Sequence, residues 1–343
     1  MHGNYSNLRS FVEEVERREG SKEDYVAHQG AIEMAYDSQL VLEGQGMFGI
    51  NDHAHGQIAT THNIPKAYYD RMGEIPGLRT QNVNSWMKAS PASKRFVRIL
   101  DGEARAFLSD RFRPIDNYEL LNTSIIPALD PLSDSLQVLS TSLSPRKMYM
   151  QIVFPTLQAE VKAGDIVQYG ITISNSEVGA GAVNVEELIW RLICENGMKG
   201  VSMFKKHHLG RRMDQDYGMF SDETVKQELV TYQMQLKDII TSALKDKDGL
   251  MSHVRRLQGA MNDAIVDAPT TVENVTKRYG ITQDKTDPIL ETLYKEGKNR
   301  YGLAQAITAL AHSTDNPDDQ DSYESTGGKI ITLTNSEWKV LAS

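Results

Sequence analysis

Apolar residues occupy every second position between residues 148 and 154, and this alternation constrains the fold more than any other feature. The residues are Met148, Met150, Ile152 and Phe154. Successive side chains of a β-strand point to opposite faces, so a period of two places all four on one face. Such a face has to be buried in a core, which a sheet packed on one side provides. We therefore expect an antiparallel sheet around this segment.

Other segments carry strand signals of the same kind. Residues 96–100 and 104–108 are rich in β-forming residues and are separated by Asp101-Gly102, a pair that favours a tight hairpin turn. Further strands are expected at 136–142, 147–154 and 165–174.

Helical periodicity covers most of the remaining chain. Pro65 predicts a break between two short helices, because the residue before a proline is pushed out of the helical region. Thr270-x-x-Glu273 has the form of a capping box that opens a helix. The acidic segment 314–325 is expected to be a solvated loop or lid. Helices are expected at 6–20, 51–61, 66–72, 117–128, 183–193, 221–245, 250–265, 270–279, 288–296 and 300–312.

These elements predict an α+β fold with an antiparallel sheet backed by helices. The sheet is expected from residues 96–174, with the helix at 183–195 packed on it. The expected organisation is a helical N-terminal region (1–93), an α+β core (94–215) and a helical C-terminal region (216–343).

Composition limits the compartment and the partners. The chain of 343 residues has a net charge of −9, which argues against a uniformly basic nucleic-acid binder. The charge is uneven, because 94–113 and 191–215 are net positive while 315–324 is acidic. We find no apolar run long enough for a membrane span and no signal peptide. Cys194, the only cysteine, is expected to be a buried thiol, so the sequence indicates a cytoplasmic protein.

Motifs for catalysis are missing from the sequence. There is no phosphate-binding loop with the Gly-x-x-x-x-Gly-Lys-Ser/Thr pattern, no Gly-x-Ser-x-Gly and no His-Glu-x-x-His. His53 and His55 are two apart, so a helix would point their rings away from each other. Gly179-Ala180-Gly181 forms either a tight connection, which we favour, or an anion site at a helix start. We expect no catalytic set, no metal site and no cofactor.

One metal site remains as an alternative. Asp110, Asp116 and Asp165 are candidates to meet in the fold and hold a divalent metal, as in a nuclease, although each also fits a turn or a cap.

Basic side chains give the best candidate site. Arg111 and Arg113 are expected on one side of a strand with Phe112 on the other, Arg146-Lys147 is expected to open another strand, and 205–212 is expected to be a basic loop. Lysine and arginine at such spacing can follow a phosphate backbone. The predicted DNA-binding residues are Arg105, Arg111, Arg113, Lys147, Lys205, Lys206, His207, Arg211 and Arg212.

Several segments together resemble a family of phage and plasmid proteins, the domain of unknown function 932. The resemblance is carried by Gln57–Met72, Asn82–Trp86, Arg105–Asn117, Gly164-Asp165, Ile173–Gly179, Trp190–Met198 and Tyr301–Thr308. The expected order of strands and helices is also similar to the core of phage single-strand annealing proteins of the RecT, Red-beta and Erf type. This second likeness is one of fold alone.

The likeness implies a phage or plasmid recombination protein. Such a protein binds single-stranded DNA, anneals strands without ATP and assembles into a ring or filament of identical chains. A non-enzymatic phage protein that acts on a host or defence factor, or a metal-dependent nuclease, stays open as an alternative.

Overall fold

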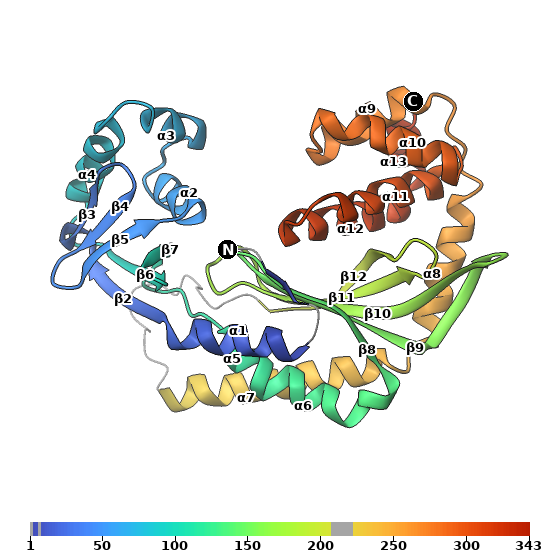
Figure 1. Cartoon of the computed structure of the whole chain (residues 1–343), viewed down its shortest axis with the longest axis horizontal. Helices are drawn as coiled ribbons and strands as arrows, with labels where there is room; N and C mark the ends of the chain where they lie inside the picture. Colours follow the sequence, from blue (N-terminus) through green and yellow to red (C-terminus); the bar gives the residue numbers. More distant parts are fainter. Residues whose placement is uncertain (1–2, 6–7, 207–221) are drawn as a thin grey trace.

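Two six-stranded sheets organise the computed structural model, which describes residues 3–5, 8–206 and 222–343. Each sheet has its own hydrophobic core. Figure 1 shows the smaller sheet with its helices as one lobe, and the larger sheet with the C-terminal helices as the other. The fold is therefore α+β with helices near both ends of the chain, as the sequence predicts.

The smaller lobe is formed by residues 22–109. Its strands are β2 (Lys22–His28), β3 (Ile32–Ala35), β4 (Gln39–Leu42), β5 (Gly46–Ile50), β6 (Lys94–Leu100) and β7 (Glu103–Ser109). They lie in the order β2-β6-β7-β5-β4-β3, and only the β5–β7 pair is parallel. Helices α2 (Asp52–Thr61), α3 (Lys66–Met72) and α4 (Leu78–Ala89) bury apolar residues against this sheet.

The expected hairpin is confirmed as β6–β7. Asp101 and Gly102 both have positive φ, 53° and 78°, which is the backbone of a type I′ turn. Aspartate and glycine tolerate this conformation, and its twist matches that of the two strands.

The larger sheet is antiparallel throughout. Its strands are β1 (Gly3–Tyr5), β8 (Gln137–Leu143), β9 (Met148–Lys162), β10 (Asp165–Asn175), β11 (Val183–Arg191) and β12 (Asn196–Lys206), hydrogen-bonded in that order. Met148, Met150, Ile152 and Phe154 are fully buried on it, so the predicted strand is confirmed. The residues between them are buried as well, so the expectation of a sheet packed on one side only is wrong.

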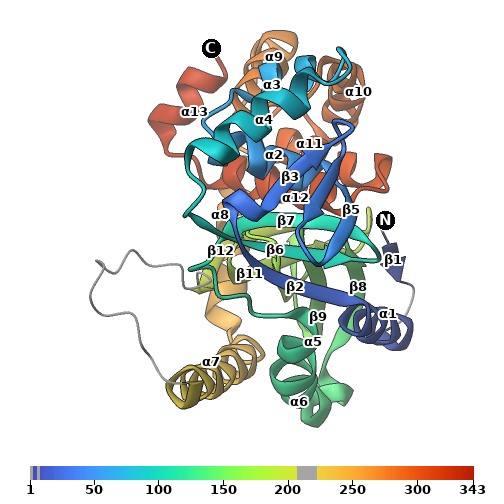
Figure 2. The same ribbon diagram turned by 90° about the vertical axis from the view of Figure 1, so that its left-hand side faces the viewer.

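Helices cover both faces of the larger sheet. In Figure 1 one group lies below it and another stands above it, and Figure 2 shows the same molecule from the side. The lower group is α1 (Leu8–Gly20), α5 (Asn117–Leu120), the π-helical turn Leu121–Ile125, α6 (Ile126–Leu129) and α7 (Asp222–Ala243), with α8 (Lys247–Ala260) beside the sheet. The upper group is α9 (Ala268–Tyr279), α10 (Thr286–Glu296), α11 (Arg300–Ala309), α12 (Pro317–Thr332) and α13 (Asn335–Leu341). Short 3₁₀ turns occupy Gln29–Ala31, Asp130–Ser135, Gln283–Lys285 and Leu310–Ser313.

The helix expected at 183–193 is wrong, because this segment is strand β11. Its pairing with β12 shifts register between Val185 and Glu186 and again before Leu188. The extra residue at each shift lies in β12, so β11 itself keeps its period of two. Leu188 is buried on the face toward α12, whereas Val185 and Ile189 are buried on the opposite face, and together they stand at spacings of three and four. The same spacing marks an amphipathic helix, so the pattern misled the prediction. The hairpin at 96–108 also belongs to the smaller sheet and not to the sheet of 136–174.

Three further expectations are corrected. The region 1–93 is not purely helical, because strands β1 to β5 lie within it. Four of them are too short to give a periodic signal, and β2 is largely polar and mostly exposed. The acidic segment 314–325 is not a loop, because helix α12 begins there at Pro317. Asn316 caps this helix by accepting a hydrogen bond from the Asp318 amide, and Asp318 and Asp319 favour its positive N-terminal end. The cap of α9 is Asp267 and not a box opened by Thr270.

A buried ion cluster joins the two sheets. The Arg98 side chain on β6 is 0% exposed and donates two hydrogen bonds of 2.9 Å to the Asp24 carboxylate and one of 2.8 Å to the Glu177 carbonyl. It also lies 2.8 Å from Asp116 just before α5. Glu177 follows the larger sheet and accepts from Arg105 of β7 at 2.7 Å, so the lobes are held by paired charges.

Within the described ranges, no helix has the length and apolar character that a membrane crossing requires.

Candidate functional site

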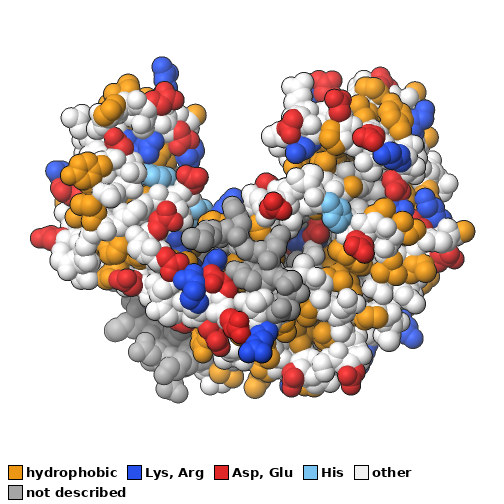
Figure 3. All heavy atoms as spheres, in the orientation of Figure 1, with side chains coloured by type: hydrophobic (Ala, Val, Ile, Leu, Met, Phe, Trp, Pro, Cys, Tyr) orange, Lys and Arg blue, Asp and Glu red, His pale blue; other side chains and the backbone are white. Residues whose placement is uncertain are grey.

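A cleft of about 900 Å³ lies between the two lobes, and Figure 3 shows the hollow. We call it the interlobe cleft. One wall is formed by α2 and the end of β7, and the other by the β8–β9 turn and the start of α12. Its polar and charged lining residues are Asn51, Asp52, His53, Gln57, Thr60, Thr61, Lys66, Arg95, Ser109, Arg146, Asn316, Asp318 and Asp319.

The α2 wall is fixed by hydrogen bonds to both lobes. Gln57 accepts from the Phe107 amide at 2.7 Å and donates to the Val178 carbonyl at 2.7 Å. His53 Nε2 also lies 3.0 Å from the Val178 carbonyl, and burial lowers the pKa of this imidazole. Both side chains are thus held by hydrogen bonds within the protein, and the lowered pKa makes His53 a neutral part of the wall.

Arg95 is a half-buried cation in the cleft whose side-chain partner is a neutral amide. Its guanidinium donates to the Gln29 amide oxygen at 2.9 Å and lies 5.8 Å from the centre of the Phe107 ring. Burial lowers the pKa of Arg95. Asp110 is near enough for its charge to raise the pKa of Arg95 in part, but among the described residues no carboxylate forms an ion pair with it. A half-buried cation of this kind gains from an anion brought by a ligand.

Arg146 faces the same cleft from the opposite lobe. Its backbone is fixed by two hydrogen bonds. The Arg146 amide donates to Ser144 Oγ at 3.0 Å, and the Arg146 carbonyl accepts from Ser176 Oγ at 2.8 Å. Its side chain is exposed. Lys66 adds a third charge and is paired with Asp70 one helical turn away.

The carboxylates in the cleft are held by neighbours. Asp318 accepts from Ser144 Oγ at 2.9 Å and from the Tyr149 hydroxyl at 2.7 Å. Asp319 accepts from Asn316 Nδ2 at 3.1 Å. The arrangement leaves Arg95 and Arg146, one from each lobe, as the side chains best placed for an anionic ligand.

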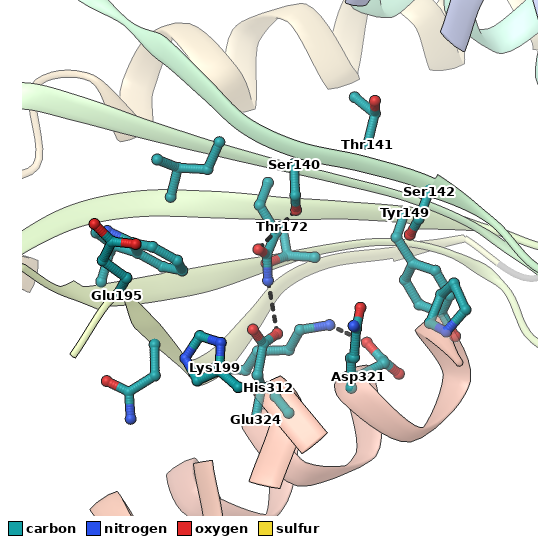
Figure 4. Close-up of a pocket in the computed structure, with 17 residues that line it drawn as sticks. Ser140, Thr141, Ser142, Tyr149, Thr172, Glu195, Lys199, His312, Asp321 and Glu324 are labelled. Carbon is teal, nitrogen blue, oxygen red and sulfur yellow. Dashed lines mark hydrogen bonds and ion pairs between the residues drawn. The ribbon is translucent and has the colours of Figure 1, made fainter. Parts of the chain in front are cut away.

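A second cavity, of about 230 Å³, lies between the larger sheet and α12 (Figure 4). We call it the sheet cavity. Its floor is a row of directly paired residues on β8, β9 and β10, namely Ser140, Gln151 and Thr172. Glu186 of β11 continues the row beyond Thr172. Directly paired residues point to the same face, so the register alone gathers these polar groups.

Helix α12 supplies the roof of the sheet cavity. Ser140 Oγ donates to the Gln151 amide oxygen at 2.8 Å, and Gln151 Nε2 donates to the Glu324 carboxyl at 2.6 Å. Lys199 on β12 pairs with Asp321 and lies 3.6 Å from Glu186. Figure 4 shows Lys199, Asp321 and Glu324 converging in the space between the sheet and α12.

The charges in the sheet cavity perturb one another. Burial raises the pKa of Glu324 to about 7, and the nearby Lys199 and the Gln151 hydrogen bond offset only part of this effect. Burial alone would lower the pKa of Lys199, but the carboxylates around it, Asp321 first, raise it. At neutral pH the cavity therefore holds a charged lysine and a carboxyl close to its midpoint.

Two adjacent glycines let α12 pack closely on both the sheet and α11. A Cβ on Gly328 would lie 1.7 Å from the Lys199 carbonyl oxygen of β12, and one on Gly327 would lie 2.3 Å from a methyl of Thr308 on α11. Gly328 thus fixes the height of Asp321 and Glu324 above the strands.

Replacing Glu324 by Gln should flatten the dependence of stability on pH. The pKa of Glu324 in the folded protein, about 7, lies above the ordinary value of 4.5 for a glutamate. The stabilising effect of the neutral form is therefore fully present below pH 4.5 and is lost as pH rises through 7. Between pH 5 and pH 8, we expect the free energy of unfolding to fall by roughly 2 kcal/mol more in the original protein than in Glu324→Gln. Urea unfolding at a series of pH values measures this, and parallel curves would contradict it.

The structure separates the predicted DNA-binding residues into groups. Arg105 is buried in the ion pair with Glu177, so it is corrected to a structural cation. Lys147 is half-buried and lies 3.8 Å from Asp321. Arg111 and Arg113 are exposed just beyond Ser109, but in an irregular segment and not on a strand.

Two of the remaining predicted contacts, Lys205 and Lys206, are the last residues of β12 and not part of a loop. Their side chains, and His207, Arg211 and Arg212, lie outside the described part of the chain.

The other sequence candidates have structural partners. Asp116 pairs with Lys22 and Arg98, whereas Asp165 pairs with Arg191 and accepts from Tyr301. In the described segments no group of three or more potential ligands that could hold a metal ion occurs. The segment 179–181 connects two strands, so the anion site at a helix start does not form.

Cys194 is half-buried and not fully buried as expected. Its thiol contacts Arg191 and Glu296, and burial raises its pKa.

Comparison with protein-family models, with curated proteins and with solved structures finds no match to this chain. The likeness to phage and plasmid proteins stays a prediction from the sequence.

Proposed function

We propose that this protein binds single-stranded DNA in the interlobe cleft and promotes annealing of strands without ATP. The observation that carries the proposal is the pair of cations, Arg95 and Arg146, that face the cleft from opposite lobes with no carboxylate at ion-pair distance among the described residues. Phosphate groups are the anions that such guanidinium groups bind best.

The shape of the cleft supports a strand over a small molecule. Its volume of about 900 Å³ lies at the upper end of ordinary ligand pockets, and it is bounded by two lobes and not enclosed by one. Arg111 and Arg113, exposed beyond Ser109, extend the positive charge past the end of the cleft. A flexible backbone with regularly spaced charges can follow such a path.

The net charge of −9 does not oppose this proposal. Association depends on the local field where the phosphates lie. The cleft carries Lys66, Arg95 and Arg146 beside three aspartates, two of which, Asp318 and Asp319, accept hydrogen bonds from neighbouring side chains. Annealing requires many bases held in register, so we also propose that several chains assemble along a strand, through one repeated interface.

The double variant Arg95→Gln, Arg146→Gln tests the proposal. We expect it to weaken binding of oligonucleotides of every sequence. The slope of log K against log salt should become shallower by about 1.4, since each contact to a single strand contributes about 0.7. Fluorescence anisotropy over a salt series measures both quantities, and light scattering of the same mixtures reports assembly.

A matched control carries the same change of charge elsewhere. Lys277 and Lys295 are exposed on α9 and α10 and do not line the cleft. The double variant Lys277→Gln, Lys295→Gln should bind as the original protein does. If both double variants lose affinity equally, or neither does, the cleft is not the binding surface.

A further inference from the structure

The sheet cavity adjoins the interlobe cleft. Tyr149 lines the cavity, and its hydroxyl donates to Asp318, which lines the cleft. Pro317, the first residue of α12, lines the cavity, while the next residue faces the cleft. The start of α12 therefore separates the two spaces, and a group attached to a ligand in the cleft would enter the cavity by passing it.

Two buried polar atoms in the lining of the cavity have no hydrogen-bond partner among the residues that the structure describes. One is the hydroxyl of Thr172, a residue that is 1% exposed. Asn196 is 4% exposed, and its Oδ1 atom is also unpaired. The orientation of this amide is fixed, because Nδ2 donates to Thr308 Oγ1 at 2.7 Å and to Gln305. Leaving such atoms unpaired costs stability, which a hydrogen-bonding ligand would restore.

The charge of the cavity selects the class of ligand. Glu195, Asp321 and Glu324 line it, and its one lysine, Lys199, is already paired with Asp321. A phosphate would meet this negative field, so anions are disfavoured. The carboxylates near Lys199 favour a ligand that brings hydrogen-bond donors, such as an amino group.

The volume of the sheet cavity and its aromatic lining residues limit the class of ligand further. A volume of about 230 Å³ is below that of drug-sized pockets, so it admits one small ring system and not a whole nucleotide. The rings of Tyr149 and Trp190 are among its walls. Aromatic side chains beside hydrogen-bonding groups are the usual surroundings of an unstacked base.

We propose that the sheet cavity receives one unstacked nucleobase, of the kind that carries an exocyclic amino group. The proposal rests on the proposed binding of a single strand in the cleft, where the phosphates would stay while the base turns inward. The Thr172 hydroxyl, which can both donate and accept, would bond one edge of the base. Asn196 lies two strands away and about 16 Å further along the sheet, so it would not contact the same base.

The experiment compares two probes that differ only in their bases. One is an oligo-deoxycytidine of about 12 nucleotides and the other is a strand of abasic residues of the same length. We expect the protein to bind the first about ten-fold more tightly, since the base contributes contacts that the backbone does not. Free cytidine, measured by calorimetry, shows whether the cavity takes a base that is not part of a strand.

The variant Thr172→Val removes the unpaired hydroxyl and keeps the shape. It should lower affinity for oligo-deoxycytidine about five-fold, the loss expected for one neutral hydrogen bond, and leave affinity for the abasic strand unchanged. Its melting temperature should be unchanged or higher, because no hydrogen bond within the protein is lost. The matched variant Thr271→Val removes a hydroxyl that donates to the Asp267 carbonyl at 2.7 Å, so it should melt lower and bind as before.

The outcomes separate the two proposals. Equal affinity for both strands, or no effect of Thr172→Val, overturns the base site while the cleft proposal stands. Binding of free cytidine without binding of any strand supports the base site and overturns the cleft proposal. Absence of binding by all three probes overturns both.

Discussion

Replacing Arg98 by Met should destabilise the protein by about 3–5 kcal/mol. The methionine side chain fills much of the same space, but the carboxylates of Asp24 and Asp116 and the Glu177 carbonyl lose the cation between them. Burial raises the pKa of Asp116, and at present Arg98 and Lys22 outweigh this effect and lower it. Without Arg98 this buried carboxylate is only partly compensated. Chemical denaturation at neutral pH measures the loss.

The matched control is Arg17→Met. Arg17 on α1 also donates two hydrogen bonds to one carboxylate, that of Asp101, at 2.8 and 3.0 Å. Its side chain is 49% exposed, so solvent screens the pair and the change should cost less than about 1 kcal/mol. Equal losses in the two variants would show that burial of the Arg98 cluster contributes nothing.

Local signals predicted the elements that local chemistry determines. The Asp101-Gly102 hairpin and the strand over 148–154 were predictable because turn type and period two are properties of neighbouring residues. The helices at 51–61 and 66–72 followed from Pro65 in the same way.

Elements that depend on register were not predictable from one sequence. Strand β11 buries Leu188 on one face and Val185 and Ile189 on the other, because both faces of the sheet are covered, and together these residues have the spacing of a helix. The assignment of β6 and β7 to a separate sheet depends on their pairing with β2 and β5, which lie far away in sequence. A short stretch of the sequence does not reveal either of these features.

The candidate site was the least predictable part. Ser140, Gln151 and Thr172 come together through the alignment of three strands, and nothing in their neighbours marks them. Asp321 and Glu324 belong to a segment whose acidic composition indicated solvent. The signals that pointed the other way were Asn316-Pro317, a cap followed by a first-turn proline, and the pair Gly327-Gly328.

The prediction of DNA contacts from charge alone mixed two kinds of cation. Arg105 and the exposed Arg111 look alike in the sequence, yet the first is enclosed with Glu177. Arg95, which the cleft singles out, was counted in a basic segment but not chosen. Its burial beside Phe107 becomes visible only in the fold.

Replacing Gly328 by Ala should be as damaging as losing a buried charge, although alanine is the better helix former. The new methyl would lie 1.7 Å from the Lys199 carbonyl oxygen, a backbone atom of β12 that cannot turn aside. Helix α12 must therefore move away from the sheet, which separates Asp321 from Lys199 and Glu324 from Gln151. We expect a net loss of about 3 kcal/mol, after the gain of about 1 kcal/mol from helix propensity.

The control for this variant is Gly259→Ala. Gly259 is an exposed residue of α8, and a Cβ added there would meet no atom within 4 Å. The same substitution should stabilise the protein by about 0.5–1 kcal/mol, because only the helix propensity changes. Thermal unfolding of the two variants should therefore shift in opposite directions. A shift in the same direction would mean that α12 tolerates a side chain at Gly328, and that its close approach does not fix the geometry of the sheet cavity.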